Sequence, residues 1–373
     1  MANARSIVTF RVDARREVGL GHLRRCVALA DALRGRGCAT RIICSEPFAP
    51  SVATLVGSHP VLCIGGPSSA VGQERPADEQ AADAAATLAV IGRGDEASWV
   101  VVDDYELGLV WERVLSAAGH RVMAIDDFRD RRHHADLLVS DAEIQFDPRL
   151  NECDRACDLV GREYTLIGQE YAYRGASAPS GDSIRLLISY GGSDPTGETL
   201  KALAAIDTLM HGAHALRSIA RVDVVVGQFN PRGDAIAAAA RIVGARVHVS
   251  PLGLAPLLQD SDLFLTAGGN SLAEALALRK PCLVTVTADN QQLVVDELAA
   301  DRFIRVIGKH GKVGASEVAA AITATCADLA VFAEQVAARA AFDHLGADRI
   351  ADVLLSSRAA ARPARPTAAR RPE

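Results

Sequence analysis

The chain has 373 residues, enough for two or three domains, and 49% of them are hydrophobic and 23% charged. That composition excludes a wholly disordered chain. Aromatic residues make up 4% and the formal net charge is −6, so a base-stacking platform and general binding to a nucleic-acid backbone are both disfavoured.

The chain lacks the sequence signals of membrane insertion, secretion and metal binding. No apolar run approaches the ~18 residues of a membrane span, and Arg11 and Asp13 interrupt the first apolar segment, unlike a signal peptide. The eight cysteines include no C-x-x-C pair, which argues against a zinc site or a disulfide framework. We therefore expect a cytoplasmic protein that uses no metal or other cofactor and binds neither nucleic acid nor membrane.

Short apolar runs alternate with helical patterns through the first half of the chain. The predicted strands cover residues 7–12, 40–44, 61–64, 99–103, 122–126 and 136–139. Helices are predicted at 23–33, 78–91 and 110–118. Continuous apolar strands separated by helices are typical of a parallel sheet covered on both faces.

The same alternation restarts after a loop-like stretch at 174–183. The predicted strands are 184–190, 222–226, 247–249, 263–266 and 282–287. Helices are predicted to begin near 196, 234, 271 and 291, and three more helical stretches cover about 315–326, 329–343 and 347–356.

The sequence therefore predicts two doubly wound α/β domains, 1–173 and 184–355, joined by a linker at 174–183. In such sheets ligands bind beyond the carboxyl ends of the strands, so a cleft between the domains is the expected site. The Ala-, Arg- and Pro-rich tail at 356–373 is expected to be disordered and dispensable.

The loop after the first predicted strand carries Asp13 and then Gly19, Gly21 and His22 before the helix. Glycines let the backbone approach a ligand closely. Arg24 stands where a G-x-G-x-x-G fingerprint needs its third glycine, so an NAD site is disfavoured. A histidine in such a loop is a competent general base, and capping or packing of the helix is the alternative interpretation.

Acidic pairs follow two other predicted strands of the first half. They are Asp103-Asp104, with Tyr105 after it, and Asp126-Asp127. Carboxylates at strand ends can orient the histidine, hold a sugar hydroxyl or bind a metal, and they can also only cap loops and form turns. Tyr105 can contact a ligand or pack over the sheet edge.

Two glycine-rich turns in the second half each lie between a strand and a helix. They contain Gly191-Gly192 and Gly268-Gly269. Backbone N–H groups at such helix N-termini suit a diphosphate. Neither turn contains G-K-[ST], so ATPase chemistry is disfavoured.

The helix after the second turn opens with polar residues that can serve a ligand or the helix itself. Ser271 can cap the helix or bind phosphate. Glu274 can accept hydrogen bonds from ribose hydroxyls or compensate the helix dipole.

These motifs, in this order, resemble the nucleotide-sugar hydrolases of the pseudaminic-acid pathway, which are UDP-2,4-diacetamido-2,4,6-trideoxy-β-L-altropyranose hydrolases. The resemblance spans about residues 7–310 and rests on RVD at 11–13, GLGHLRRC at 19–26, VDDY at 102–105, IDD at 125–127, HADLL at 134–138, SYGGSD at 189–194 and ADNQ at 288–291. It implies a GT-B fold, similar to that of the MurG glycosyltransferase. It also implies metal-independent attack of water on the anomeric carbon, releasing free sugar and UDP.

The resemblance also implies roles for individual residues. His22 activates the water and Tyr105 assists it, with Asp104 at the position where family members often have histidine. The residues implied to hold the nucleotide and sugar are Asp13, Gly19, Gly21, Arg25, Gly191, Gly192, Gly268, Gly269, Asn270, Ser271, Glu274 and Gln291. Asn270 stands in for a family asparagine that aligns with Ala273.

Two other functions use the same donor site. One is a GT-B glycosyltransferase that moves the sugar from a nucleotide-sugar donor to a hydroxyl other than water. The other is a nucleotide-sugar-binding module without catalysis. Incubation with the donor alone separates them, because only a hydrolase releases stoichiometric free sugar and nucleoside diphosphate.

Overall fold

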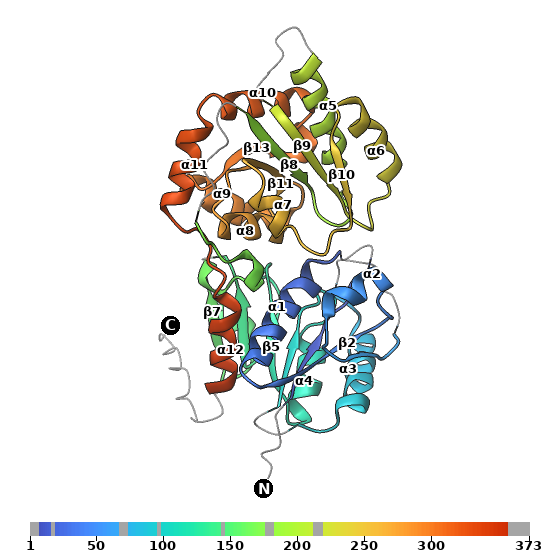
Figure 1. Ribbon diagram of the computed structural model, residues 1–373. Coiled ribbons are helices and arrows are strands. Elements are labelled where there is room, and N and C mark those ends of the chain that lie inside the picture. The colour runs from blue at the N-terminus through green and yellow to red at the C-terminus, as the bar shows by residue number, and fades with distance from the viewer. Residues whose placement is uncertain are drawn as a thin grey trace, which may run out of the picture. The chain divides into compact units, whose positions relative to one another are not determined.

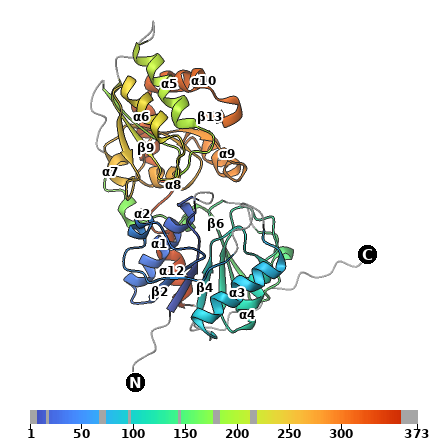
Figure 2. The ribbon, with the colours of Figure 1, turned by 90° about the vertical axis from the view of Figure 1, so that its right-hand side faces the viewer.

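A computed structural model describes residues 7–15, 19–66, 74–94, 98–142, 146–175, 183–211 and 219–356. These residues form two compact units (Figures 1 and 2). The first consists mainly of His22–Leu166 and includes the N-terminal strand and the residues from Leu345 to 356, and the second consists mainly of Ile167–His344. Most of the predicted linker (176–182) and the tail beyond residue 356 lie outside the described residues.

The first unit is built on a parallel sheet of seven strands in the order β3-β2-β1-β4-β5-β6-β7. The strands are β1 (Ile7–Arg11), β2 (Ala39–Cys44), β3 (Val61–Cys63), β4 (Trp99–Val102), β5 (Arg121–Ile125), β6 (Leu137–Ser140) and β7 (Cys157–Val160). Every residue of β4 and β6 is buried. Such strands need cover on both faces of the sheet, as their continuous apolar runs predict.

Helices provide that cover (Figure 2). They are α1 (Gly21–Gly35), α2 (Pro50–Ala53), α3 (Ala77–Ile91), α4 (Leu109–Ala117) and α12 (Gly346–Ser356). α3 packs against α4 on one face. α1 and α12 are tied together by Arg36, whose guanidinium donates to Asp348 Oδ1 at 2.5 Å and to Asp352 Oδ1 at 2.7 Å.

α12 belongs to the first unit, whereas the sequence predicts that residues up to 355 belong to the second domain. Arg349 donates to the carbonyl of Glu163 at 2.8 Å. A Cβ on Gly346 would lie 2.1 Å from the carbonyl oxygen of Thr165. The prediction failed because an apolar stripe shows that a helix face is buried but does not identify the surface that buries it.

The start of the second unit also differs from the predicted boundary at residue 173. Ile167 and Tyr171 are buried in the core of the second unit. The hydroxyl of Tyr171 accepts a hydrogen bond from the backbone N of Leu254 at 3.2 Å. The change of unit therefore falls between Leu166 and Ile167.

The second unit is built on a parallel sheet of six strands in the order β10-β9-β8-β11-β12-β13. The strands are β8 (Ile184–Ser189), β9 (Ile219–Val226), β10 (Arg246–Val249), β11 (Leu263–Ala267), β12 (Cys282–Val286) and β13 (Arg305–Lys309). The helices are α5 (Glu198–His211), α6 (Gly233–Ile242), α7 (Ala255–Gln259), α8 (Asn270–Ala277), α9 (Gln292–Ala300), α10 (Ala315–Cys326) and α11 (Leu329–Ala338). α5 packs against both α6 and α10 (Figure 1).

Short 3-10 turns connect several elements of both units. They cover Thr54–Val56, Pro148–Leu150, Arg162–Tyr164, Gln169–Tyr171, Asp289–Gln291 and His310–Lys312. Within the described ranges, no single helix is long and apolar enough to cross a membrane.

Each sheet has one point where its strand order reverses. This point lies between β1 and β4 in the first unit and between β8 and β11 in the second. Loops leave such neighbours in opposite directions and open a crevice at their carboxyl ends, where ligands of doubly wound sheets bind. The loops predicted to carry the chemistry follow these strands in both units.

Candidate functional site

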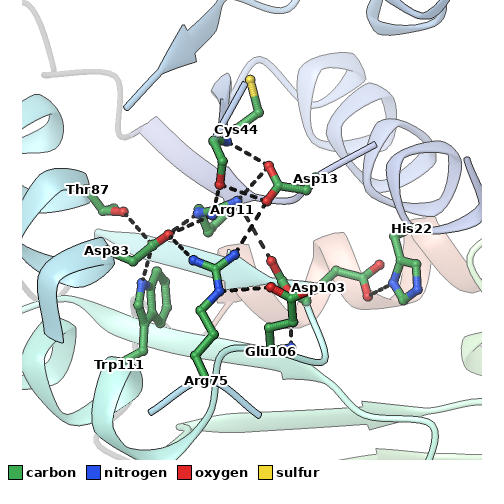
Figure 3. A network of polar contacts seen from close by, with 12 residues as sticks. Arg11, Asp13, His22, Cys44, Arg75, Asp83, Thr87, Asp103, Glu106 and Trp111 are labelled. Atoms are coloured by element: carbon green, nitrogen blue, oxygen red, sulfur yellow. Dashed lines mark hydrogen bonds and ion pairs between the residues drawn. The ribbon is translucent and has the colours of Figure 1, made fainter. Parts of the chain in front are cut away.

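His22 lies in the first turn of α1, beside the loop that follows β4 (Figure 3). Its Nδ1 is 2.6 Å from Oδ1 of Asp103, the residue directly after β4. The backbone N of Asp103 donates to the carbonyl of Arg11 at 3.1 Å, which extends the pairing of β1 with β4. The Asp103 side chain is fully buried, while that of His22 is 11% exposed. Asp103 therefore holds the imidazole from its buried side, and part of the His22 side chain remains accessible to solvent.

The ionisation of Asp103 determines which imidazole nitrogen carries the hydrogen in this contact. Burial alone would raise the pKa of Asp103, but Arg25 and His22 hold it well below its usual range. An ionised carboxylate only accepts hydrogen bonds, so Nδ1 of His22 carries the hydrogen. In neutral imidazole the lone pair then lies on Nε2. A histidine fixed in this tautomer is arranged as a general base.

Arg25 fixes the carboxylate that orients the histidine. It lies three residues after His22, on the same face of α1. Its Nε and Nη2 donate to the two oxygens of Asp103 at 2.5 and 2.6 Å, and its Nη1 donates to both oxygens of Asp127 at 2.9 and 3.0 Å. Because one guanidinium joins two carboxylates, the loops after β4 and β5 are held together around His22.

Tyr105 packs against the histidine and closes this cluster. Its ring meets that of His22 edge to face, with centroids 4.6 Å apart and an interplanar angle of 84°, and it also contacts Phe128. Its hydroxyl donates to Asp127. Burial and the carboxylate of Asp127 raise the pKa of Tyr105 well above its usual value. The phenol therefore remains protonated and serves as a hydrogen-bond donor.

The carboxylate of Asp104 faces the charges of Arg11 and the loop after β4, not the histidine. Arg11 belongs to a buried network that lies behind the loops (Figure 3). Asp104 Oδ1 accepts from the backbone N of Glu106 at 2.9 Å, and its Oδ2 lies 3.9 Å from Arg11 Nη1. Burial raises its pKa. The sequence resemblance implies a catalytic role for Asp104, but the residue that contacts His22 is Asp103. Consecutive residues after a strand point to opposite sides, and the sequence does not show which side faces the site.

Arg11 is the centre of that buried network. Its Nε and Nη2 donate to the two oxygens of Asp83 at 3.1 and 2.7 Å, and its Nη2 also donates to Ser45 Oγ at 2.7 Å. Arg75 joins Asp83 to Glu106 through contacts of 3.2 and 2.9 Å. The network connects β1, α3 and the loop after β4, so it supports the site without entering it.

Asp13, predicted to bind substrate, is also buried in this network. Its Oδ1 accepts from the backbone N of Ser45 at 2.7 Å and its Oδ2 accepts from Ser45 Oγ at 2.8 Å. Arg11 Nη1 lies 3.1 Å from its Oδ1. These contacts assign Asp13 a role in fixing the loop after β1, and a role in binding remains a prediction.

In the second unit, the loop after β8 turns sharply at Gly191. Its φ of 81° is in the left-handed region that favours glycine. The carbonyl of Gly192 accepts from the backbone N of Phe229 at 3.1 Å, and a Cβ on Gly227 would lie only 2.2 Å from that oxygen. The loop after β9 therefore supports the glycine turn, a contribution of Gly227 that the sequence analysis missed.

The loop after β11 leads into α8, whose first turn carries several predicted ligand-binding residues. Gly269 is the N-cap residue and Asn270 and Ser271 are the first two helical residues, so Ser271 does not have the predicted capping position. N–H groups in a first turn lack partners within the helix. Glu274 lies one turn further along and is buried. This arrangement suits an anion at the helix N-terminus, with a carboxylate beside it.

Gln291 holds the adjoining loops together. Its Oε1 accepts from the backbone N of Gly268 at 3.2 Å and from the backbone N and hydroxyl of Thr287 at 3.0 and 3.1 Å. A Cβ on Gly268 would lie 2.5 Å from Val295, so only glycine fits there. The predicted contact of Gln291 with substrate would have to use its amide NH₂.

A cavity of about 600 Å³ lies at the opposite end of the strands of the second sheet, at their amino ends. Its lining includes Asp262 and Pro281, which directly precede β11 and β12. It is therefore distinct from the glycine loops at the carboxyl ends of those strands. Among the described residues, no group of three or more His, Cys, Asp or Glu side chains is placed to hold a metal ion.

Comparison with known proteins identifies relatives in fold only. No protein-family model matches the chain, and no curated protein matches it in sequence. A MurG from Acinetobacter baumannii superposes with a TM-score of 0.62 at 12% identity, covering 94% of this chain and 99% of the other. LpCGTa in complex with UDP has a TM-score of 0.64 at 15% identity, covering 96% and 100%.

A third similar structure is that of a protein from Listeria monocytogenes named as a putative UDP-N-acetylglucosamine 2-epimerase. Its TM-score is 0.59 at 16% identity, covering 95% of this chain and 96% of the other. The chain therefore has a GT-B-like fold of two parallel-sheet α/β units, as expected from its sequence.

Proposed function

We propose that this GT-B-like chain is an enzyme that cleaves the bond between the anomeric carbon and the nucleotide of a nucleotide sugar. The observation that carries the proposal is the pairing of His22 with Asp103 at the carboxyl end of β4. In the proposed reaction His22 Nε2 removes the proton from an attacking hydroxyl, and Asp103 stabilises the imidazolium that forms. Arg25 and Tyr105 hold the pair in place.

The second unit is proposed to bind the nucleotide. The glycine turn at Gly191-Gly192 and the N-terminus of α8 supply backbone N–H groups for the diphosphate, and Glu274 supplies an acceptor for ribose. Two similar structures hold UDP, one of LpCGTa and one of MnaA from S. aureus. These two structures support a uridine nucleotide as the first one to test.

Transfer of the sugar to an acceptor hydroxyl is the favoured reaction. Several structures of similar fold are called glycosyltransferases, including one for calicheamicin and one for lipopolysaccharide biosynthesis. The base has the same task in either reaction, because a hydroxyl of an acceptor and a hydroxyl of water both lose one proton to it.

Hydrolysis of a UDP-sugar, with an amino-deoxy sugar for nonulosonic acid or surface-glycan synthesis as product, is the second candidate. It is favoured by the sequence resemblance, whose motif residues His22, Arg25, Asp103, Tyr105 and Asp127 contact one another. Water needs no acceptor-binding surface, so a histidine packed against one tyrosine would be sufficient.

A donor screen decides between these reactions. The chain is incubated with a panel of UDP-sugars, alone and with a pool of sugar and lipid-linked acceptors, and products are identified by mass spectrometry. Nucleoside diphosphate release that depends on an acceptor supports transfer, and stoichiometric free sugar from the donor alone supports hydrolysis. UDP binding without either product would contradict the enzyme proposal and favour a binding module.

A further inference from the structure

Two cysteines of the first unit face each other across neighbouring strands. Cys44 ends β2 and Cys63 ends the edge strand β3, and the two residues are direct partners in the parallel register. Their Sγ atoms are 3.5 Å apart. Both are free thiols, with Cys44 buried and Cys63 exposed.

We propose that Cys44 and Cys63 form a reversible thiol–disulfide site that reacts with small oxidised disulfides. Direct partners on neighbouring strands are about 4.8 Å apart, within the 4.4–6.8 Å range between Cα atoms in known disulfides. The sulfurs need to approach by only about 1.5 Å to reach bonding distance. No rearrangement of the strands is required.

The different exposure of the two cysteines determines which of them reacts first with the small disulfide. The thiolate of Cys63 attacks one sulfur of the small disulfide, forms a mixed disulfide and releases the first small thiol. Burial raises the pKa of the Cys44 thiol, so this cysteine is the poorer first nucleophile. Cys44 then loses its proton and attacks Cys63 Sγ, and the second small thiol leaves. The two protein sulfurs lose two electrons, and the small disulfide gains them.

The product would secure a strand that has little other support. β3 has three residues, lies at the edge of the sheet and pairs only with β2 among the described strands. A disulfide would bind its end covalently to β2, next to Ser45, whose backbone and hydroxyl hold Asp13. Cross-linking also restricts the unfolded chain, so the oxidised protein is expected to melt several degrees higher.

The test is oxidation of the full chain with oxidised glutathione, followed by intact-mass and peptide analysis. No Lys or Arg lies between Arg41 and Arg75, so trypsin leaves both cysteines in one peptide. Additional cleavage by chymotrypsin after Phe48 separates them. We expect a mass loss of two hydrogen atoms, a cross-linked pair of peptides containing Cys44 and Cys63, and full reversal by dithiothreitol.

Cys63→Ser should abolish the cross-link and the rise in melting temperature while leaving the fold intact, since Cys63 is exposed. Cys157→Ser is the matched control, because Cys157 lies on β7, the other edge strand of the same sheet, and it should oxidise like the wild type. Glutathione that stays on Cys63 without resolving, or eight free thiols after oxidation, would overturn the proposal. Neither readout depends on the proposed enzymatic activity.

Discussion

The carboxylates of Asp103 and Asp104 are adjacent in sequence but have different surroundings. Asp103 contacts His22 and is ionised beside Arg25, and Asp104 faces Arg11 with a pKa raised by burial. The first is a positioning residue for the proposed base. The second belongs to the network that supports the loops.

Replacing each in turn distinguishes these roles. Asp103→Asn removes the carboxylate that sets the histidine tautomer, and turnover is expected to fall by about 10²-fold or more. Asp104→Asn changes a side chain that contacts Arg11 and the backbone of Glu106 instead of His22, so turnover should stay within a few-fold of wild type. The measurement is kcat on the donor found in the screen, with thermal unfolding as a check of folding. The reverse order of effects would return Asp104 to the catalytic role that the sequence predicts.

The sequence singles out His22 and Tyr105 as candidates and offers both acidic pairs as groups that can orient the histidine, but it does not show which carboxylate makes the contact. A polar residue after a strand is visible in the sequence, and so is a histidine at a helix start. The side to which each member of Asp103-Asp104 or Asp126-Asp127 points depends on the exact end of the strand. Arg25 was included through the resemblance alone, because an arginine on a helix face gives no sign that it joins two distant carboxylates.

Among the elements, α4 and the end of β5 are joined through a buried histidine. His133 Nδ1 lies 2.7 Å from Glu112 Oε1, and its Nε2 lies 3.2 Å from Asp126 Oδ2. Burial alone would lower the pKa of His133, but the two carboxylates raise it to about 10. A raised pKa means that the charged form stabilises the fold. This contribution is fully present below the ordinary value of about 6.5 and is lost as pH rises towards 10.

The variant His133→Gln should therefore lose stability in a pH-dependent way. At about pH 6 the loss is expected to be about 3–5 kcal/mol, because two buried carboxylates lose their charged partner. The difference from wild type should shrink as pH approaches 10. Urea unfolding across this range measures it, and His211→Gln, which removes an exposed histidine paired with Asp207, should show little effect at any pH. A constant difference would contradict the raised pKa.

α12 provides a second test among the elements. It follows the second unit in the chain but belongs to the first unit. Gly346→Ala places a Cβ against the carbonyl of Thr165, where it would lie at 2.1 Å. The helix must shift, and we expect a loss of about 1–3 kcal/mol in the free energy of unfolding. Gly35→Ala, at the end of α1 with no atom within 4 Å of the new Cβ, is the control and should be neutral. Equal stability of both variants would contradict this docking of α12.

The elements themselves were largely predictable, because apolar periodicity shows where strands and helices lie. The strands from β1 to β6 were predicted within one or two residues of their ends. β7, at the sheet edge, escaped notice because Cys157–Val160 includes Asp158 and only Leu159 is buried. The assignment of α12 failed for a different reason: its partners Arg36 and Glu163 are distant in sequence, and no local pattern identifies them.

Over the whole molecule, different observations support the fold and the proposed chemistry. Two parallel sheets with a reversal of strand order follow from the alternation of strands and helices, and similar solved structures share this architecture. The proposed chemistry depends on a few side chains at the carboxyl ends of β1, β4 and β5. In the proposed function the second unit binds the nucleotide and the first carries out the proton transfer, so the two functions should be separable by mutation.

The variant His22→Asn tests that separation most directly. UDP affinity, measured by calorimetry, should remain within a few-fold of wild type, because the proposed nucleotide contacts come from the loops after β8 and β11. Turnover of the nucleotide sugar identified in the screen should fall by about 10²–10⁴-fold, the usual contribution of a positioned general base. A folded His22→Asn chain that turns over its donor at a near-normal rate would contradict the central claim that His22 is the base.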